Sequence, residues 1–185
     1  MDGRESQFLR VLAELDLPGR WAALVASGLP EAPPEPGGGI DLYRAEQMLD
    51  DIGVPFRPKE YDDEDYWPMR RVERYADHAL ILTISSPDPS GVHSNRLEFG
   101  LEIILTEPAG RTRTYGGRLP RLIIAIGRHL DPAGAPPEPP PYFLFLGRDE
   151  ARRAFDWFLD LSRAVSARTT ELSWPVPDGP YATDD

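Results

Sequence analysis

Apolar residues recur every three or four positions in the first third of the chain, which is the spacing of one helix face. The first such set is Phe8, Leu9, Leu12 and Leu15. A second helix is predicted to begin near Pro18, because proline is favoured in a first helical turn, and to end near Gly28. A third is predicted over 42–52, with Asp41 as its N-cap and Gly53 just beyond its end.

The middle of the chain changes to the alternating pattern of β-strands. Strands are predicted at about 69–75, 79–86 and 97–105, with a shorter partner at 111–115. The clearest alternation places Leu97, Phe99, Leu101, Ile103 and Leu105 on one face. In 79–86 both alternating sets are largely apolar, which predicts a central strand covered on both faces.

Two later segments and the connections between them complete the pattern. The sequence LPRLIIAIGRHL at 119–130 has three isoleucines, which favour a strand, but its apolar residues follow helical spacing after Pro120 and predict a helix. A short buried strand is expected within YFLFL, followed by a helix over 148–167. The Pro/Gly-rich stretches 30–39 and 132–141 predict irregular connectors. Together these elements predict one α+β domain over 1–170, with an antiparallel or mixed β-sheet packed by N-terminal and C-terminal helices, and a loose tail at 171–185.

Composition and charge narrow the class of protein. The 185 residues are 41% hydrophobic and 28% charged, as in ordinary globular proteins, and contain no cysteine. No apolar run reaches the length of about 20 residues that a membrane helix needs, and the N-terminus lacks the pattern of a secretory signal. We therefore expect a cytoplasmic protein. The net charge of −11, with 15 acidic and 6 basic residues in 1–66, disfavours direct binding to nucleic acid.

The sequence contains few candidate catalytic or metal-binding residues. The three histidines are widely spaced, and no HExxH pattern or histidine pair at i, i+4 is present, so no metal or cofactor is predicted. Ser85 or Ser86 could form a hydrolase arrangement with Asp88 and His93, but no GxSxG motif frames either serine. The serines, with Ser90, also fit ordinary turn chemistry. The main prediction is a protein that is not an enzyme.

Two glutamates on the strand predicted at 97–105 could do acid–base chemistry if they were buried together. Glu98 and Glu102 project from the same face, but their Cα atoms would lie about 13 Å apart in an extended chain. That distance is too large for one carboxylate to raise the pKa of the other. We expect these side chains instead to meet arginines across the sheet, such as those within 70–74.

The strongest candidate binding feature is an acidic run flanked by aromatic residues. It comprises Tyr61, Asp62, Asp63, Glu64, Asp65, Tyr66 and Trp67. Consecutive carboxylates repel one another and gain nothing from a core, so they are either solvated or neutralised by a partner. The aromatic side chains could anchor such a partner. The alternative is a solvated loop whose flanking aromatic residues belong to the core.

Three blocks in the centre of the chain resemble a known family. They are LTISSPD at 82–88, RLEFGLEIILTEP at 96–108 and LPRLIIAIGRHL at 119–130, with Phe99, Gly100 and Glu102 at matching positions. In this order they are similar to the suppressor of fused domain family. The resemblance implies a binding domain: eukaryotic members sequester a transcription factor, and bacterial members encoded beside toxins look like immunity proteins.

The sequence therefore predicts a cytoplasmic immunity protein that binds and neutralises a cognate bacterial toxin. Residues 61–67 would be the first contact with a basic toxin domain, and the protein would be a monomer or weak dimer. The alternative is a secretion chaperone or assembly adaptor that binds an extended segment of its client.

Overall fold

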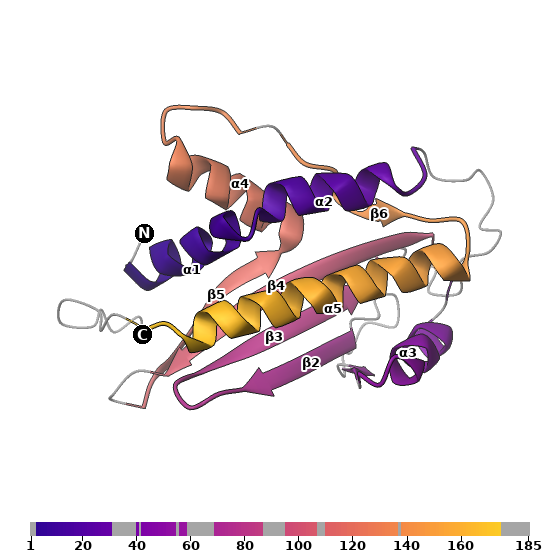
Figure 1. Cartoon of the computed structure of the whole chain (residues 1–185), viewed down its shortest axis with the longest axis horizontal. Coiled ribbons are helices and arrows are strands. Elements are labelled where there is room, and N and C mark those ends of the chain that lie inside the picture. The colour runs from indigo at the N-terminus through magenta and orange to yellow at the C-terminus, as the bar shows by residue number, and fades with distance from the viewer. Residues whose placement is uncertain are drawn as a thin grey trace, which may run out of the picture.

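An antiparallel β-sheet forms the centre of the molecule in a computed structural model, and long helices cover one face of it (Figure 1). The structure describes residues 3–30, 40, 42–54, 56–58, 69–86, 95–106, 110–136 and 138–174. The helices are α1 (Gly3–Glu14), α2 (Leu17–Ala26), α3 (Leu42–Asp51), α4 (Leu119–Leu130) and α5 (Arg148–Thr170). The strands are β1 (Arg57–Pro58), β2 (Met69–Arg74), β3 (His78–Ser85), β4 (Arg96–Thr106), β5 (Thr112–Arg118) and β6 (Phe143–Leu144).

The strands follow one another across the sheet in the order β1-β2-β3-β4-β5, and β6 pairs with the start of β4. Every pairing among the described strands is antiparallel, and the predicted α+β class is confirmed. The two short strands β1 and β6 carry too few residues to show a period, which is why β1 was not predicted.

The centre of the sheet is β3, as its apolar sequence predicted. Leu80, Leu82 and Ile84 join the core beneath the helices, and Leu82 lies opposite Leu101 of β4. On the other face Ala79 and Ile81 are only 7% and 2% exposed. Burial on both faces explains why this strand lacks a polar alternation.

The N-terminal helical pair forms where the sequence predicted it. Asp16 links the two helices with a left-handed backbone (φ 52°), and its carboxylate accepts a hydrogen bond of 3.2 Å from the N–H of Gly19. This N-cap satisfies one of the free donors at the start of α2. Phe8, Leu12 and Trp21 are buried against the sheet.

The segment 119–130 is a helix, as its apolar spacing and Pro120 indicated. Its buried residues are Leu119, Leu122, Ile123 and Ile126. The preceding strand β5 extends through Gly116 and Gly117 to Arg118, beyond the predicted end at residue 115.

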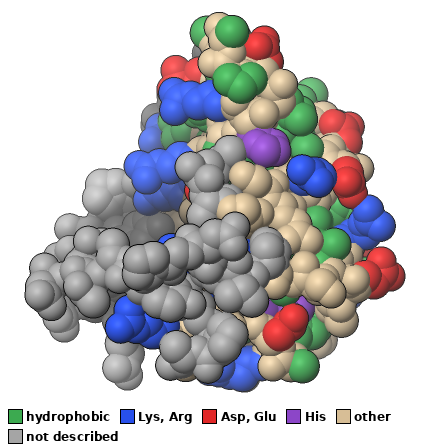
Figure 2. All heavy atoms as spheres, turned by 90° about the vertical axis from the view of Figure 1, so that its left-hand side faces the viewer, with side chains coloured by type: hydrophobic (Ala, Val, Ile, Leu, Met, Phe, Trp, Pro, Cys, Tyr) green, Lys and Arg blue, Asp and Glu red, His purple; other side chains and the backbone are tan. Residues whose placement is uncertain are grey.

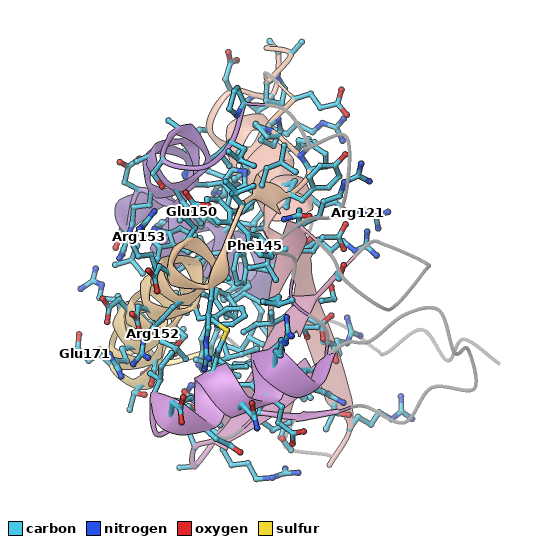
Figure 3. All side chains as sticks on the ribbon, turned by 90° about the vertical axis from the view of Figure 1, so that its right-hand side faces the viewer. Arg121, Phe145, Glu150, Arg152, Arg153 and Glu171 are labelled. Atoms are coloured by element: carbon cyan, nitrogen blue, oxygen red, sulfur yellow. The ribbon has the colours of Figure 1, made fainter. Side chains whose placement is uncertain are left out.

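Helix α5, of 23 residues, lies over the sheet and runs nearly along the direction of β3 and β4 (Figure 1). It carries the apolar stripe that its sequence predicted, since Ala151, Phe155, Phe158 and Val165 are buried. At its N-terminus the Glu150 carboxylate accepts hydrogen bonds from the backbone N–H groups of Leu146 and Gly147. Beyond its end Trp174 packs against the core, and Ser173 accepts a hydrogen bond from Gln7 through its carbonyl oxygen. Seen from the side, α5 and the N-terminal helices lie on the same side of the sheet (Figure 3).

Candidate functional site

The residues predicted as the partner-binding run, Tyr61 to Trp67, lie outside the described residues, so that site stays a prediction. The hydrolase alternative is described only at its serines. Ser85 is 3% exposed and Ser86 is fully buried, whereas 87–94, which include Asp88, Ser90 and His93, also lie outside. A buried hydroxyl is a poor position for a nucleophile that must reach a substrate.

Glu98 meets an arginine across the sheet, as expected, but its partner is Arg118 and not one of the arginines within 70–74. Its Oε1 accepts a hydrogen bond of 3.1 Å from Arg118, which lies on β5 rather than β2. The pairing of Gly100 with Arg118 brings this arginine within reach of a residue two positions earlier on β4. Arg121, another basic neighbour, lies on the side of the sheet away from α5 (Figure 3).

Burial dominates the electrostatics of Glu98, which is only 5% exposed. Desolvation raises the pKa of its carboxyl above the ordinary 4.5, and Arg118, a hydrogen bond from Ser85 and Arg121 lower it by less. Its Oε2 has no hydrogen-bond partner among the described residues.

This shift makes a pH-dependent contribution to stability. A carboxyl whose pKa is higher in the folded state favours folding below its unfolded pKa, and that contribution is lost as pH rises through the folded pKa. We therefore expect the wild type to lose stability relative to Glu98→Gln as pH rises above 4.5. Urea unfolding of both proteins from pH 4 to pH 8 would measure this. A difference that is flat, or that grows in favour of the wild type with pH, would contradict it.

A row of three polar side chains, exposed at Asp77 and buried at His78 and Thr169, joins the β2–β3 turn to the end of α5. His78 Nδ1 lies 2.7 Å from Asp77 Oδ1, and its Nε2 lies 3.2 Å from Thr169 Oγ1. The ring stacks on Tyr75 with 4.6 Å between centroids. The order acid, imidazole, hydroxyl resembles that of a catalytic triad, but Thr169 is fully buried and donates its hydroxyl to the carbonyl of Ser166. These hydrogen bonds therefore hold the β2–β3 turn against α5. His78 is the first residue of β3 and is buried.

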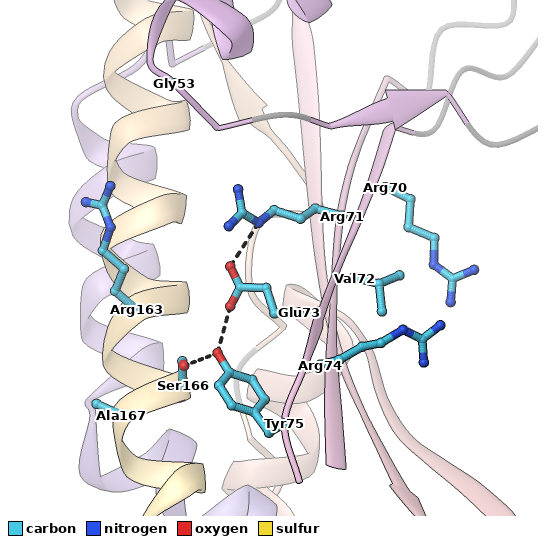
Figure 4. A pocket seen from close by; sticks show the side chains of 10 residues that line it. All are labelled: Gly53, Arg70, Arg71, Val72, Glu73, Arg74, Tyr75, Arg163, Ser166 and Ala167. Carbon is cyan, nitrogen blue, oxygen red and sulfur yellow. Dashed lines mark hydrogen bonds and ion pairs between the residues drawn. The ribbon is translucent and has the colours of Figure 1, made fainter.

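A groove of about 980 Å³ lies between β2 and α5. Its lining residues are Gly53, Arg70, Arg71, Val72, Glu73, Arg74, Tyr75, Arg163, Ser166 and Ala167. Figure 4 shows that alternate residues of β2 point in opposite directions, as in any strand. Arg71, Glu73 and Tyr75 point toward α5, whereas Arg70, Val72 and Arg74 point to the other face of the sheet.

The side toward α5 is held by a short polar network. The Nε of Arg71 lies 2.9 Å from Glu73 Oε1, and the Tyr75 hydroxyl donates to Glu73 Oε2 at 3.1 Å (Figure 4). The same hydroxyl shares a short hydrogen bond with Ser166 of α5. Burial raises the pKa of Tyr75, so its hydroxyl keeps its proton at neutral pH. These contacts tie the end of β2 to α5 on this side of the groove.

The outer edge of β2 is only partly paired. β1 covers Met69 and Arg70, and among the described residues no strand pairs with the outer side of Arg71–Arg74. The Tyr75 N–H donates to the carbonyl of His78, so its backbone groups point toward β3. Backbone groups alternate in direction along an antiparallel strand. The N–H and C=O of Val72 and Arg74 therefore point outward, away from β3.

The charge at this edge has the opposite sign to that of the whole chain. Arg70, Arg71, Arg74 and Arg163 line the groove with one acid, Glu73, whereas the protein carries −11. Arg70 and Arg74 have no ion pair or hydrogen bond within the described part of the chain. Elsewhere the charges are mixed: on the end of the molecule seen in Figure 2, acidic and basic side chains both occur over the described surface.

The described ranges hold no metal cluster and no membrane-spanning helix. No cluster of three or more His, Cys, Asp or Glu side chains there could hold a metal ion. No helix among the same residues combines the length and apolar character that crossing a membrane requires.

Comparison with models of protein families, with curated proteins and with solved structures found no match to this chain. The resemblance to the suppressor of fused family therefore stays a prediction from the sequence.

The groove was not predicted, although part of its signal is visible in the sequence. The run MRRVER at 69–74 places arginines at alternate positions around Val72, an unusual content for a strand inside a sheet. An edge position explains it, because charged side chains on an edge keep unwanted strands from pairing. The sequence predicted the helix but not its position beside β2.

Proposed function

We propose that this protein is a cytoplasmic protein-binding domain that acts as an immunity protein, neutralising a cognate toxin by covering its functional surface. One observation carries the proposal: a strand edge with outward backbone groups beside a groove of about 980 Å³. Exposed sheet edges are a recurring mode of protein recognition, in which backbone hydrogen bonds supply affinity and side-chain pockets supply specificity. The resemblance stated above supports the same class of function.

The edge strand β2 is held in place by β3 and by α5. β2 is paired with β3 over its whole length, from Met69 opposite Ile84 to Arg74 opposite Ala79. On the helix side, Tyr75 is tied to Ser166. A partner would therefore meet a surface that needs little ordering, which lowers the entropic cost of association.

The second candidate is a secretion chaperone or assembly adaptor, and the same edge favours it because such proteins hold extended client segments. The two functions differ in their partners. An immunity protein restores growth to a cell that makes the toxin, whereas an adaptor stabilises or delivers a client that is not toxic by itself.

Co-expression with the products of the genes that flank its own would test the proposal. We expect one neighbour to stop growth when expressed alone, and this protein to restore growth by forming a stable complex with it. Neighbours of which none is toxic, or a toxic one that this protein neither binds nor relieves, would refute the immunity role. A complex with a harmless, secreted neighbour would favour the adaptor.

Once the complex is available, the acidic run can be tested directly. Replacing Asp62, Asp63, Glu64 and Asp65 by Asn or Gln should slow association about tenfold at low salt, because long-range attraction acts mainly on the association rate. The difference should shrink as salt screens the field. Stopped-flow association at several salt concentrations would measure it. Association that is unchanged at every salt concentration would exclude 61–67 as part of the interface.

A further inference from the structure

We infer that the partner element which binds the outer edge of β2, beside the β2–α5 groove, is an extended acidic segment that adds to the sheet as a strand next to Val72 and Arg74. This inference rests on the proposed function, since it names the chemistry of the partner at that site. It concerns a different surface from the acidic run at 61–67, which was predicted to meet a basic part of the partner.

The backbone of β2 sets where such a strand can bind. The pairing of β1 with β2 reaches only as far as Arg70, which lies opposite Arg57. The next outward-facing residues along β2 are Val72 and Arg74. Their N–H and C=O groups offer two donors and two acceptors to an added strand. The β2–β3 turn limits the site beyond Tyr75, whose N–H is already bonded to His78. The site is therefore short and takes only a few residues of the partner.

The side chains beside these backbone groups select acidic residues. A residue opposite Val72 would share its face with Arg70 and Arg74, its two diagonal neighbours, and a residue opposite Arg74 would meet that arginine directly. Val72 itself is 40% exposed and offers little apolar area. Arg71 already faces Glu73, so among the described residues the arginines of β2 without an ion pair are Arg70 and Arg74. Two acids at alternate positions of an extended segment would neutralise both.

The same charges argue against other occupants. If a second copy of this chain paired with the edge around Val72, Arg70 of one copy would lie opposite Arg74 of the other, and like charges in that position are destabilising. A basic strand meets the same repulsion. An apolar strand would leave both arginines without partners while removing water from them, which is costly. The edge thus excludes the common wrong partners by charge.

The test uses three fluorescein-labelled octapeptides in a threonine and valine frame. The first carries glutamate at alternate positions, the second carries lysine at the same positions, and the third is the glutamate peptide with N-methyl groups on the amides that would bond to β2. Fluorescence anisotropy would measure binding at low salt, and NMR would locate it. We expect the glutamate peptide to bind and to shift the amide signals of Val72 and Arg74. The lysine peptide should not bind, and N-methylation should weaken binding at least tenfold.

Variants of the protein provide the matching arm. Arg70→Glu/Arg74→Glu should lose the glutamate peptide and gain the lysine peptide. Arg128→Glu, a single reversal at an exposed arginine on α4 away from β2, should leave binding of the glutamate peptide unchanged. Val72→Pro removes one outward donor without removing a β2–β3 bond and should weaken binding. If that variant fails to fold, the N-methylated peptide supplies the same information.

Three results would overturn the inference: equal binding of both charge types, equal binding of the N-methylated peptide, or no binding of the glutamate peptide. These results are separable from failure of the proposed function. A toxin complex that forms while the glutamate peptide does not bind would reject the acidic strand alone. Peptide binding at Val72 and Arg74 without any toxic neighbour would reject the immunity role and leave the strand site standing.

Discussion

Replacing Trp21 with alanine should lower the free energy of unfolding by about 3–5 kcal/mol, the usual cost of removing a large buried aromatic side chain. Trp21 is 1% exposed and lies at the junction of several elements. Its ring meets Phe99 of β4 edge-on at 6.3 Å and Trp157 of α5 at 6.0 Å. Its Nε1 donates a hydrogen bond of 3.1 Å to the carbonyl of Pro140. One side chain thus holds α2, the sheet, α5 and the segment before β6 together.

Trp21→Phe is the matched control for this prediction. It keeps an aromatic ring in the site but loses the bond to Pro140 and part of the volume, so a loss of about 1–2 kcal/mol is expected. Urea unfolding followed by circular dichroism would compare the two variants with the wild type. If Trp21→Ala lowered the free energy of unfolding no more than Trp21→Phe, the packing of the ring would not stabilise this junction.

The helices and the long strands could be predicted because their evidence is local. Helical spacing in 119–130 outweighed its isoleucines, since a face that must be buried against one layer fixes the period of the pattern. The burial of β3 on both faces also followed from its composition alone. The contacts between distant segments could not be predicted in the same way. An arginine across the sheet was expected beside Glu98, with those within 70–74 as examples, but the β4–β5 register places Arg118 there.

In the candidate site, too, the local sequence pattern could be recognised but the long-range contacts could not. The arginines of β2 are plain in the sequence, but their meaning depends on β2 being the last long strand of the sheet and on α5 lying beside it. Both facts arise from the order of strands and from a helix about 90 residues further along the chain. The Asp77–His78–Thr169 chain depends on the same long-range contact. Local patterns therefore predict elements well and sites formed between distant elements poorly.

Gly116→Ala should be among the most damaging single-atom additions to this protein. Gly116 has a positive φ of 121°, which residues other than glycine rarely adopt. It also lies close to the backbone of β4. A Cβ there would lie 2.3 Å from the carbonyl oxygen of Leu101 and 2.8 Å from Cα of Glu102. Backbone atoms of a central strand cannot move aside as a flexible side chain can. We expect a loss of about 1–3 kcal/mol from backbone strain and a similar further loss from the clash.

Gly117→Ala separates these two costs within the same strand. Gly117 also has a positive φ, 145°, but no heavy atom lies within 4 Å of the position its Cβ would take. Its alanine variant should therefore show the strain without the clash and lose about 1–3 kcal/mol. Because Gly116 and Gly117 lie opposite Glu102 and Leu101, the clash at Gly116 should also push β5 away from β4 and weaken the Arg118–Glu98 pair. Urea unfolding of both variants would give the ranking, and two equal losses would show that β5 moves freely enough to absorb the added methyl group.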